Sequence, residues 1–302
     1  MSKGQKAESL LELKRKGLFN QKLVVLEDLP EKKDFFNLLM EKGFKNGEDL
    51  AVRFSSPTKH TNLPRSIVIK SIEGVYSFIK ENFKDGLYPI IHTFVFPDFG
   101  GTLIKKNDKF YINIVNGAWE PLSSQSCDVI ILGDEDFIWF YPEEKECLLV
   151  EGERLIKKRL KNVEEDIISL AIFIKRKVET LGFDEDILYE FIFTPDKEFV
   201  VMEFRKGVDI GDFDLQVRRL DVLEIKEGGD LDKWDKKQDL LLSVPVDREE
   251  DIVLFDIIEK IKPYKQKVYV DYGLCSHPCI ILREHGIKTI PYHIHHKKIV
   301  FS

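Results

Sequence analysis

Residues 275–287 read Cys-Ser-His-Pro-Cys-Ile-Ile-Leu-Arg-Glu-His-Gly-Ile and follow a short apolar run at residues 268–270. A glycine-containing turn separates the two segments, so the order predicts a strand, a turn with a histidine, and a helix. His277 then stands just before a helix N-terminus, where backbone N–H groups and the helix dipole favour an anion. The segment therefore predicts a small α/β arrangement that brings a histidine to an anion-binding position.

The composition is that of a folded globular protein. The chain has 302 residues, of which 43% are hydrophobic and 11% aromatic, enough for a sizeable core and two domains. A net charge of −7 argues against a general nucleic-acid binder. No apolar run reaches the about 18 residues of a membrane span, and residues 1–17 lack the apolar region of a signal peptide. We expect a cytoplasmic protein with reduced cysteines and no membrane partner.

Apolar periodicity and turn residues divide the chain into predicted elements. Residues 207–239 are charged and turn-rich and form a predicted connection, followed by alternating strands and helices. The predicted fold class is α/β (α+β), with domains at residues 1–207 and 208–302. The predicted helices cover residues 7–16, 33–42, 72–83, 154–181, 249–262 and 278–285. Strands are predicted at residues 23–26, 50–54, 67–69, 89–96, 102–105, 110–115, 129–132, 137–141, 188–193, 199–204, 240–244, 268–270, 288–290 and 298–301.

Two cations in the first half are candidates for phosphate binding. Lys6 follows a glycine at the start of a leucine-rich helix, and lysine is a compact cation that neutralises phosphate oxygens. Arg53 lies in a strand before two serines, and its fork of donors suits phosphate. The alternatives are a solvated terminal lysine and a sheet-edge arginine paired with an acidic side chain.

A predicted hairpin carries acidic residues on both of its strands. Glu190 lies on the first strand, and Glu203 and Arg205 lie on the second. Two carboxylates on one face of a hairpin can hold a Mg²⁺ ion that bridges nucleotide phosphates. The alternative is a half-exposed hairpin with alternating polar residues.

In this order the segments resemble the phosphoenolpyruvate synthase and pyruvate phosphate dikinase family, across nearly the whole chain. The similar features are a Gly-Gln-Lys start where the family has Gly-Gly-Lys, the Val-Arg strand, the acidic hairpin ending in arginine, and the Ser-His loop before a helix ending Arg-Glu-x-Gly-Ile. The resemblance implies an ATP-grasp-like two-lobed domain followed by a small phosphohistidine swivelling domain, with ATP and Mg²⁺ as ligands and release of AMP. It implies that ATP is bound by Lys6, Arg53 and Arg205, that the metal is held by Glu190 and Glu203, and that the phosphoryl group is carried by His277.

The sequence also departs from the family pattern. A phenylalanine separates Arg53 from the serines, Glu203 stands where the family usually has glutamine, and Pro278 replaces a usual alanine. The large enolpyruvate-binding barrel of the family has no room here, so the small-molecule or protein acceptor stays open, as does the oligomeric state. The sequence predicts an ATP-dependent dikinase-like phosphotransferase. The alternative is a catalytically degenerate nucleotide-binding or partner-binding protein of the same fold.

Two histidine-containing features have other interpretations. Cys275 and Cys279 flank His277, and further histidines follow up to residue 296, so a zinc site is a rival prediction, although the spacing is not a strong zinc pattern. His92 falls near a family glutamine in the strand at residues 89–96, and its simpler interpretation is a core histidine.

Overall fold

The computed structural model describes residues 3–58, 63–66, 68–117, 127–133, 137–142, 144–151, 154–161, 164–208, 222–225, 228–236, 238–242, 251–264, 267–270, 277–291 and 296–301. The chain forms two compact units whose segments alternate along the sequence. Unit 1 comprises Met1–Asp98, Leu149–Ile156 and Tyr189–Arg205, and unit 2 comprises Phe99–Leu148, Lys157–Leu188 and Lys206–Ser302. The last change from unit 1 to unit 2 along the chain comes after Arg205. The predicted domain boundary is at residue 207. The division into two contiguous domains stays a prediction.

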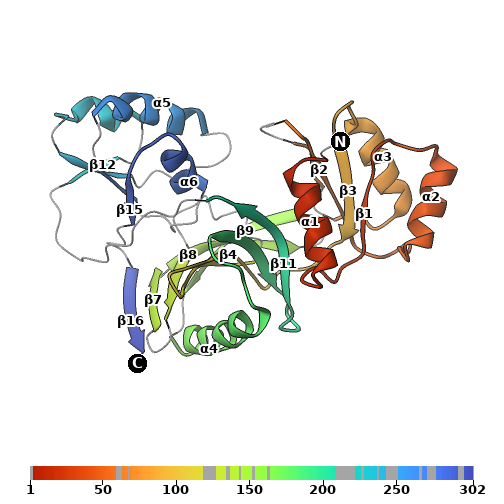
Figure 1. Cartoon of the computed structure of the whole chain (residues 1–302), viewed down its shortest axis with the longest axis horizontal. Coiled ribbons are helices and arrows are strands. Elements are labelled where there is room, and N and C mark those ends of the chain that lie inside the picture. The colour runs from red at the N-terminus through yellow and green to blue at the C-terminus, as the bar shows by residue number, and fades with distance from the viewer. Residues whose placement is uncertain are drawn as a thin grey trace. The chain divides into compact units, whose positions relative to one another are not determined.

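Unit 1 contains a three-stranded antiparallel sheet in the order β1-β3-β2. Helix α1 lies on one side of this sheet, and α2 and α3 lie on the other (Figure 1). The strands are β1 (Leu23–Val25), β2 (Leu50–Ser55) and β3 (Tyr88–Thr93), and the helices are α1 (Gln5–Arg15), α2 (Lys32–Glu41) and α3 (Ile72–Asn82).

Alternation along β2 places its side chains on two different surfaces. Leu50, Val52 and Phe54 are buried in the core formed with α2 and α3. Arg53 and Ser55 therefore face the other side, against which α1 packs. Arg53 is opposite Ile90 of β3 in the antiparallel register. The apolar side chains of β2 thus pack into the core, and its polar side chains lie on the opposite face of the sheet, where they can form a site.

Unit 1 also contains most of the predicted acidic hairpin. Strands β10 (Ile187–Phe193) and β11 (Phe199–Lys206) are neighbours, which confirms the hairpin. The turn between them includes Lys197, with a φ of 62°, and the Thr194 hydroxyl accepts the N–H of Glu198 at 3.0 Å. Glu190 and Glu203 are thereby held in two adjacent strands.

Unit 2 contains an antiparallel run of strands in the order β4-β5-β6-β7-β16. The first two strands pair over their whole length, and Asn107 and Asp108 in their turn have φ of 52° and 58°. Two successive positive φ angles are typical of a type I′ hairpin turn, and the predicted hairpin is confirmed. The elements are β4 (Phe99–Lys106), β5 (Lys109–Asn116), β6 (Asp128–Leu132), β7 (Phe137–Pro142), β16 (His296–Phe301) and helix α4 (Glu164–Leu181).

The chain after β11 forms a four-stranded parallel sheet in unit 2, in the order β12-β13-β14-β15. Its core combines strand residues such as Leu240 and Val268 with Leu254 and Ile258 of α5 and Leu282 of α6. The prediction of alternating strands and helices is confirmed, and the chain as a whole is α/β with antiparallel and parallel sheets. The elements are β12 (Val222–Ile225), β13 (Asp239–Leu242), α5 (Asp251–Ile261), β14 (Val268–Val270), α6 (His277–Glu284) and β15 (Thr289–Pro291), with short 3-10 turns at Gly228–Lys233 and Lys262–Tyr264.

The long helix predicted for residues 154–181 is wrong in its first part. Residues Arg154–Lys161 form strand β9, which pairs with β8 (Glu144–Glu151) in a two-stranded sheet, and α4 begins only at Glu164. Intrinsic preference decides little in an eight-residue segment, and here strand pairing prevails over it. Within the described residues no helix is both long and apolar enough to cross a membrane.

Candidate functional site

Five predicted site residues come together in unit 1, although they lie on four elements from three separate parts of the sequence. Their charges act on one another, since the pKa of Lys6 responds to the other four. The five residues are Lys6 in the first turn of α1, Arg53 on β2, Glu190 on β10, and Glu203 and Arg205 on β11. We call them the charged cluster.

Arg205 bridges the two carboxylates of the charged cluster. Its Nη2 lies 3.1 Å from Glu190 Oε1, and its Nε lies 3.3 Å from Glu203 Oε1. Both glutamates are 3% exposed. Within the described residues, Glu190 Oε2 has no hydrogen-bond partner. The arginine therefore orients both carboxyl groups and leaves a buried oxygen of Glu190 for another ligand.

Glu190 is the member of the cluster whose ionisation is most strongly altered. Burial, and after it the charge of Glu203, raise the pKa of Glu190 to about 7, while Arg205, Lys6 and Arg53 act in the opposite direction. A carboxyl group in this setting exchanges its proton near neutral pH. A cation placed at its free oxygen would favour the ionised form.

Lys6 and Arg53 supply positive charge that the described part of the chain does not neutralise by contact. Neither side chain has an ion pair or a side-chain hydrogen bond among the described residues. Burial lowers the pKa of Lys6. The negative charge of Glu203 acts in the opposite direction, and the positive charge of Arg53 lowers the pKa further. Cations with unfilled donors beside a helix N-terminus suit an anion with several oxygens, such as a phosphate chain.

Three contacts that the sequence did not predict fix the helix that carries Lys6. Ser55 Oγ accepts the N–H of Ala7 at 3.2 Å, and Ser9 Oγ accepts the N–H of Phe204 at 2.7 Å. A Cβ on Gly4, whose φ is 84°, would lie 2.2 Å from the carbonyl oxygen of Ser56. The available sequence signals were a serine among the leucines of the helix and a glycine before it.

His92 is buried on the same sheet as Arg53. Its Nδ1 lies 2.8 Å from the carbonyl oxygen of Thr93, which only accepts, so Nδ1 carries the hydrogen. Among the described residues Nε2 has no partner. Burial, and after it Arg53, lower the pKa of His92 to about 4, so the ring is neutral at neutral pH. The position fits a core histidine, packed at a ring distance of 6.0 Å from Phe19.

Helix α6 begins at His277, one residue before the predicted start at residue 278, so His277 is the first residue of the helix and does not precede it. The side chain of His277 and the preceding loop, including Cys275 and Ser276, lie outside the described residues. The phosphoryl-carrying role of His277 stays a prediction.

The rival zinc site falls largely on the same part of the chain. Cys275, His293 and His295 lie outside the described residues. In the part that the structure describes, no group of three or more His, Cys, Asp or Glu side chains could hold a metal ion. Cys279 is buried and forms no disulfide among the described residues.

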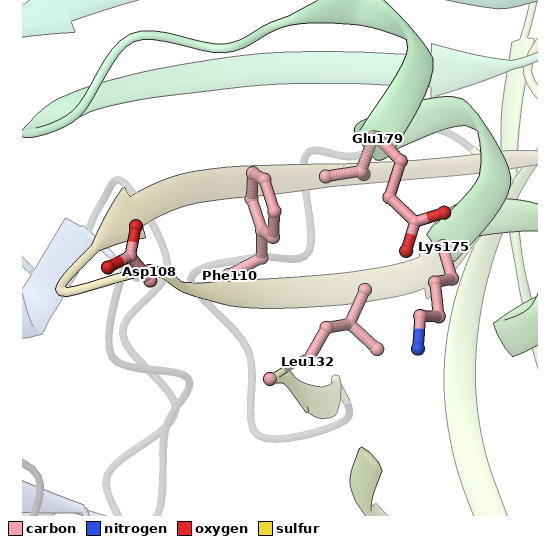
Figure 2. A pocket seen from close by; sticks show the side chains of 7 residues that line it. Asp108, Phe110, Leu132, Lys175 and Glu179 are labelled. Atoms are coloured by element: carbon pink, nitrogen blue, oxygen red, sulfur yellow. The ribbon is translucent and has the colours of Figure 1, made fainter. Parts of the chain in front are cut away.

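A small cavity lies in unit 2, and none of the predicted site residues lines it. Its volume is about 60 Å³, and Figure 2 shows Lys175 and Glu179 of α4 and Phe110 of β5 at its wall. Small-molecule sites measure roughly 300–1,000 Å³, so this cavity does not hold a nucleotide.

Searches against known proteins returned weak structural likenesses. No family model matches the chain, and no curated protein matches its sequence. The D-alanine-D-alanine ligase of Coxiella burnetii is 10% identical, with a TM-score of 0.36 over 68% of this chain and 48% of that one. The L-amino acid ligase of Bacillus licheniformis is 11% identical, with a TM-score of 0.34 over 68% of this chain and 41% of that one.

A third similar structure is carboxyaminoimidazole ribonucleotide synthase of Aspergillus clavatus, complexed with ATP. It is 12% identical, with a TM-score of 0.35 over 67% of this chain and 44% of that one. This chain therefore spans less than half of the length of these three structures. Likenesses this weak do not identify a family.

Proposed function

We propose that the chain is an ATP-dependent phosphotransferase whose unit 1 binds the phosphates of ATP through Lys6, Arg53 and Arg205. The observation that supports this is the convergence of the charged cluster from four separate elements, with two cations that have no ion pair among the described residues. Bringing such cations together without a bound anion costs free energy, because they repel one another and are partly desolvated. A phosphate chain would remove that cost.

Glu190 and Glu203 would hold Mg²⁺ in this proposal. Their chemistry fits the ion, since Mg²⁺ prefers carboxylate oxygens, and Glu190 Oε2 is buried without a partner among the described residues. Mg²⁺ supplies neutralisation of the charge on the phosphate oxygens when it is bound. Arg205 keeps the two carboxyl groups in fixed orientations, because it contacts Oε1 of Glu190 and Oε1 of Glu203.

His277 would receive the phosphoryl group. A neutral imidazole nitrogen attacks a phosphorus atom of ATP, the N–P bond forms, and the P–O bond to the rest of the nucleotide breaks and leaves its electron pair on that oxygen. Support comes from the start of α6 at His277, because an anion is favoured at a helix N-terminus. The phosphoryl group then passes to an acceptor that is a small molecule or a protein.

The second candidate function is nucleotide binding without turnover. It is favoured by the ion pairs of Arg205, which occupy one oxygen of each glutamate. A metal ion would have to share these carboxylates with the arginine. A protein that only senses or stores the nucleotide has no need of that ion.

The two functions are separated by incubating the protein with Mg²⁺ and ATP that is labelled in the β or the γ phosphate. We expect a label on the protein that is labile in acid, stable in base and lost in His277→Ala, whereas the control His285→Ala keeps it. Nucleotide binding without any label would favour the second candidate. A protein that binds no ATP has neither function.

A further inference from the structure

We infer that Ser9 and Ser55 are positioning residues, whose hydroxyl groups fix the Lys6 helix against the strands that carry the rest of the charged cluster. The inference deepens the proposed function and rests on it, because the spacing of these charges matters only if they act on one ligand. Neither serine touches that ligand in the proposal. Each acts through the backbone of a neighbouring element.

Ser55 joins the start of α1 to β2. It is 1% exposed and follows Arg53 on the same face of the strand. Its Oγ accepts the N–H of Ala7, the residue after Lys6, at 3.2 Å. The first N–H groups of a helix usually find an N-cap side chain, but the N-cap here is Gly4, which has none. A strand hydroxyl therefore does the capping and links Lys6 to Arg53.

Gly4 makes the approach to β2 closer than any side chain would allow. Its φ of 84° is in the left-handed region, and an added Cβ would lie 2.2 Å from the carbonyl oxygen of Ser56. The chain thus enters α1 in direct backbone contact with the end of β2. The contact fixes where the first turn of the helix begins.

Ser9 joins the same helix to β11. It is 2% exposed, and its Oγ accepts the N–H of Phe204 at 2.7 Å across 195 positions of sequence. Phe204 stands between Glu203 and Arg205, the two members of the cluster on β11. Among the described strands, β11 is the last in the order of its sheet, next to β10. Ser9 supplies the acceptor and brings the carboxylate strand to the Lys6 helix.

The two hydroxyl groups therefore set the separation of the charges on three elements. Ser9 lies on the same face of the helix as Lys6, three positions along. If either hydroxyl is removed, a backbone N–H loses the acceptor that joins the two elements, and the helix is free to shift. A displacement of about 1 Å is enough to weaken a positioned site up to about a hundredfold.

The test compares serines that make the same kind of hydrogen bond at different places in unit 1. Ser9→Ala and Ser55→Ala remove the two positioning hydroxyls, whereas Ser71→Ala is the matched control. Ser71 Oγ caps α3 by accepting the N–H of Gly74 at 3.0 Å, and α3 carries no member of the cluster. Calorimetric titration with Mg·ATP is expected to show roughly tenfold weaker binding for the first two variants and wild-type binding for the control.

Selective acetylation of lysines, without nucleotide, gives a second readout. Lys6 is partly buried and its pKa is lowered, whereas Lys14 on the same helix is exposed. We expect the Lys6 to Lys14 ratio of acetylation to change at least twofold from wild type in Ser9→Ala and Ser55→Ala, and not in Ser71→Ala. This readout decides the positioning role even if the wild-type protein binds no ATP, in which case only the proposed function fails.

Variants that keep a hydroxyl complete the design. Ser9→Thr and Ser55→Thr are expected to retain the wild-type acetylation ratio and ATP affinity. If an alanine variant does not fold, the threonine variant at the same position is measured in its place. The inference is overturned if Ser9→Ala and Ser55→Ala match Ser71→Ala in both readouts, or if the threonine variants are as defective as the alanine variants.

Discussion

Glu190 links the charge of the cluster to pH. Its native pKa of about 7 is above the ordinary value of 4.5, so the native state keeps a proton that the unfolded state loses. The stability from this group is fully present below pH 4.5 and is lost as the pH rises through 7. Lys6, Arg53, Glu203 and Arg205 are the charged groups that act on it.

Glu190→Gln should therefore change the pH dependence of stability. The free energy of unfolding of the variant, relative to wild type, is expected to rise between pH 4.5 and 7, because the variant has no proton to lose. Urea unfolding at a series of pH values measures the difference. His92, whose pKa of about 4 has the opposite effect, is present in both proteins. Two curves that stay parallel over this range would contradict the account.

Lys6→Met tests whether the protein keeps this lysine for function at the expense of stability. Lys6 is a partly buried cation without an ion pair in the described part of the chain, and burial lowers its pKa. An apolar side chain of similar length removes the desolvation cost. We expect an unfolding free energy equal to or above that of wild type in urea titrations, with Lys14→Met as the exposed control on the same helix. A clear loss of stability in Lys6→Met alone would mean that the lysine holds the fold together.

Residue types were predictable from the sequence, but their contacts were not. Lys6, Arg53 and the two glutamates stood out because cations and carboxylates near turns and strand ends suit phosphate and metal ligands. The bond from Phe204 to Ser9 could not be predicted, because it requires two segments 195 positions apart to meet. A local sequence pattern does not predict a contact between segments so far apart.

At the scale of elements, the start of α1 depends on a glycine for two separate reasons. Gly4 and Gly17 flank the helix, with φ of 84° and 73°. A Cβ added to Gly4 would collide with Ser56, whereas a Cβ added to Gly17 would have no neighbouring atom within 4 Å. Gly17→Ala is expected to cost about 1 kcal/mol of unfolding free energy from its backbone conformation alone. Gly4→Ala should cost clearly more, as measured by urea unfolding. Equal losses in the two variants would show that the contact with Ser56 is unimportant.

Elements with strong local signals were predicted correctly. The hairpin of β4 and β5 has Asn107 and Asp108 at its turn, two residues that accept positive φ. The segment at residues 154–161 was predicted as helix and is a strand, because its structure depends on pairing with β8. A periodic pattern decides an element only where no partner strand competes.

For the whole molecule, the sequence predicted an α/β chain, and the structure combines helices with antiparallel and parallel sheets. The division into domains at residues 1–207 and 208–302 stays a prediction. The sequence did not predict that each unit would be assembled from alternating segments. Strands far apart in the sequence associate only through the finished sheets, so their grouping is a property of tertiary contacts. The charged cluster nevertheless falls entirely within unit 1.

Binding of the phosphates of ATP is the central role proposed for this cluster. Calorimetric titration of the full chain with Mg·ATP tests it directly, with the double variant Lys6→Met, Arg53→Met beside wild type and Lys14→Met. We predict saturable binding at one site per chain for wild type and Lys14→Met, and a loss of at least about a hundredfold in affinity for the double variant, since charge-assisted contacts from two residues disappear. Absence of binding by wild type, or equal binding by the double variant, would contradict the claim.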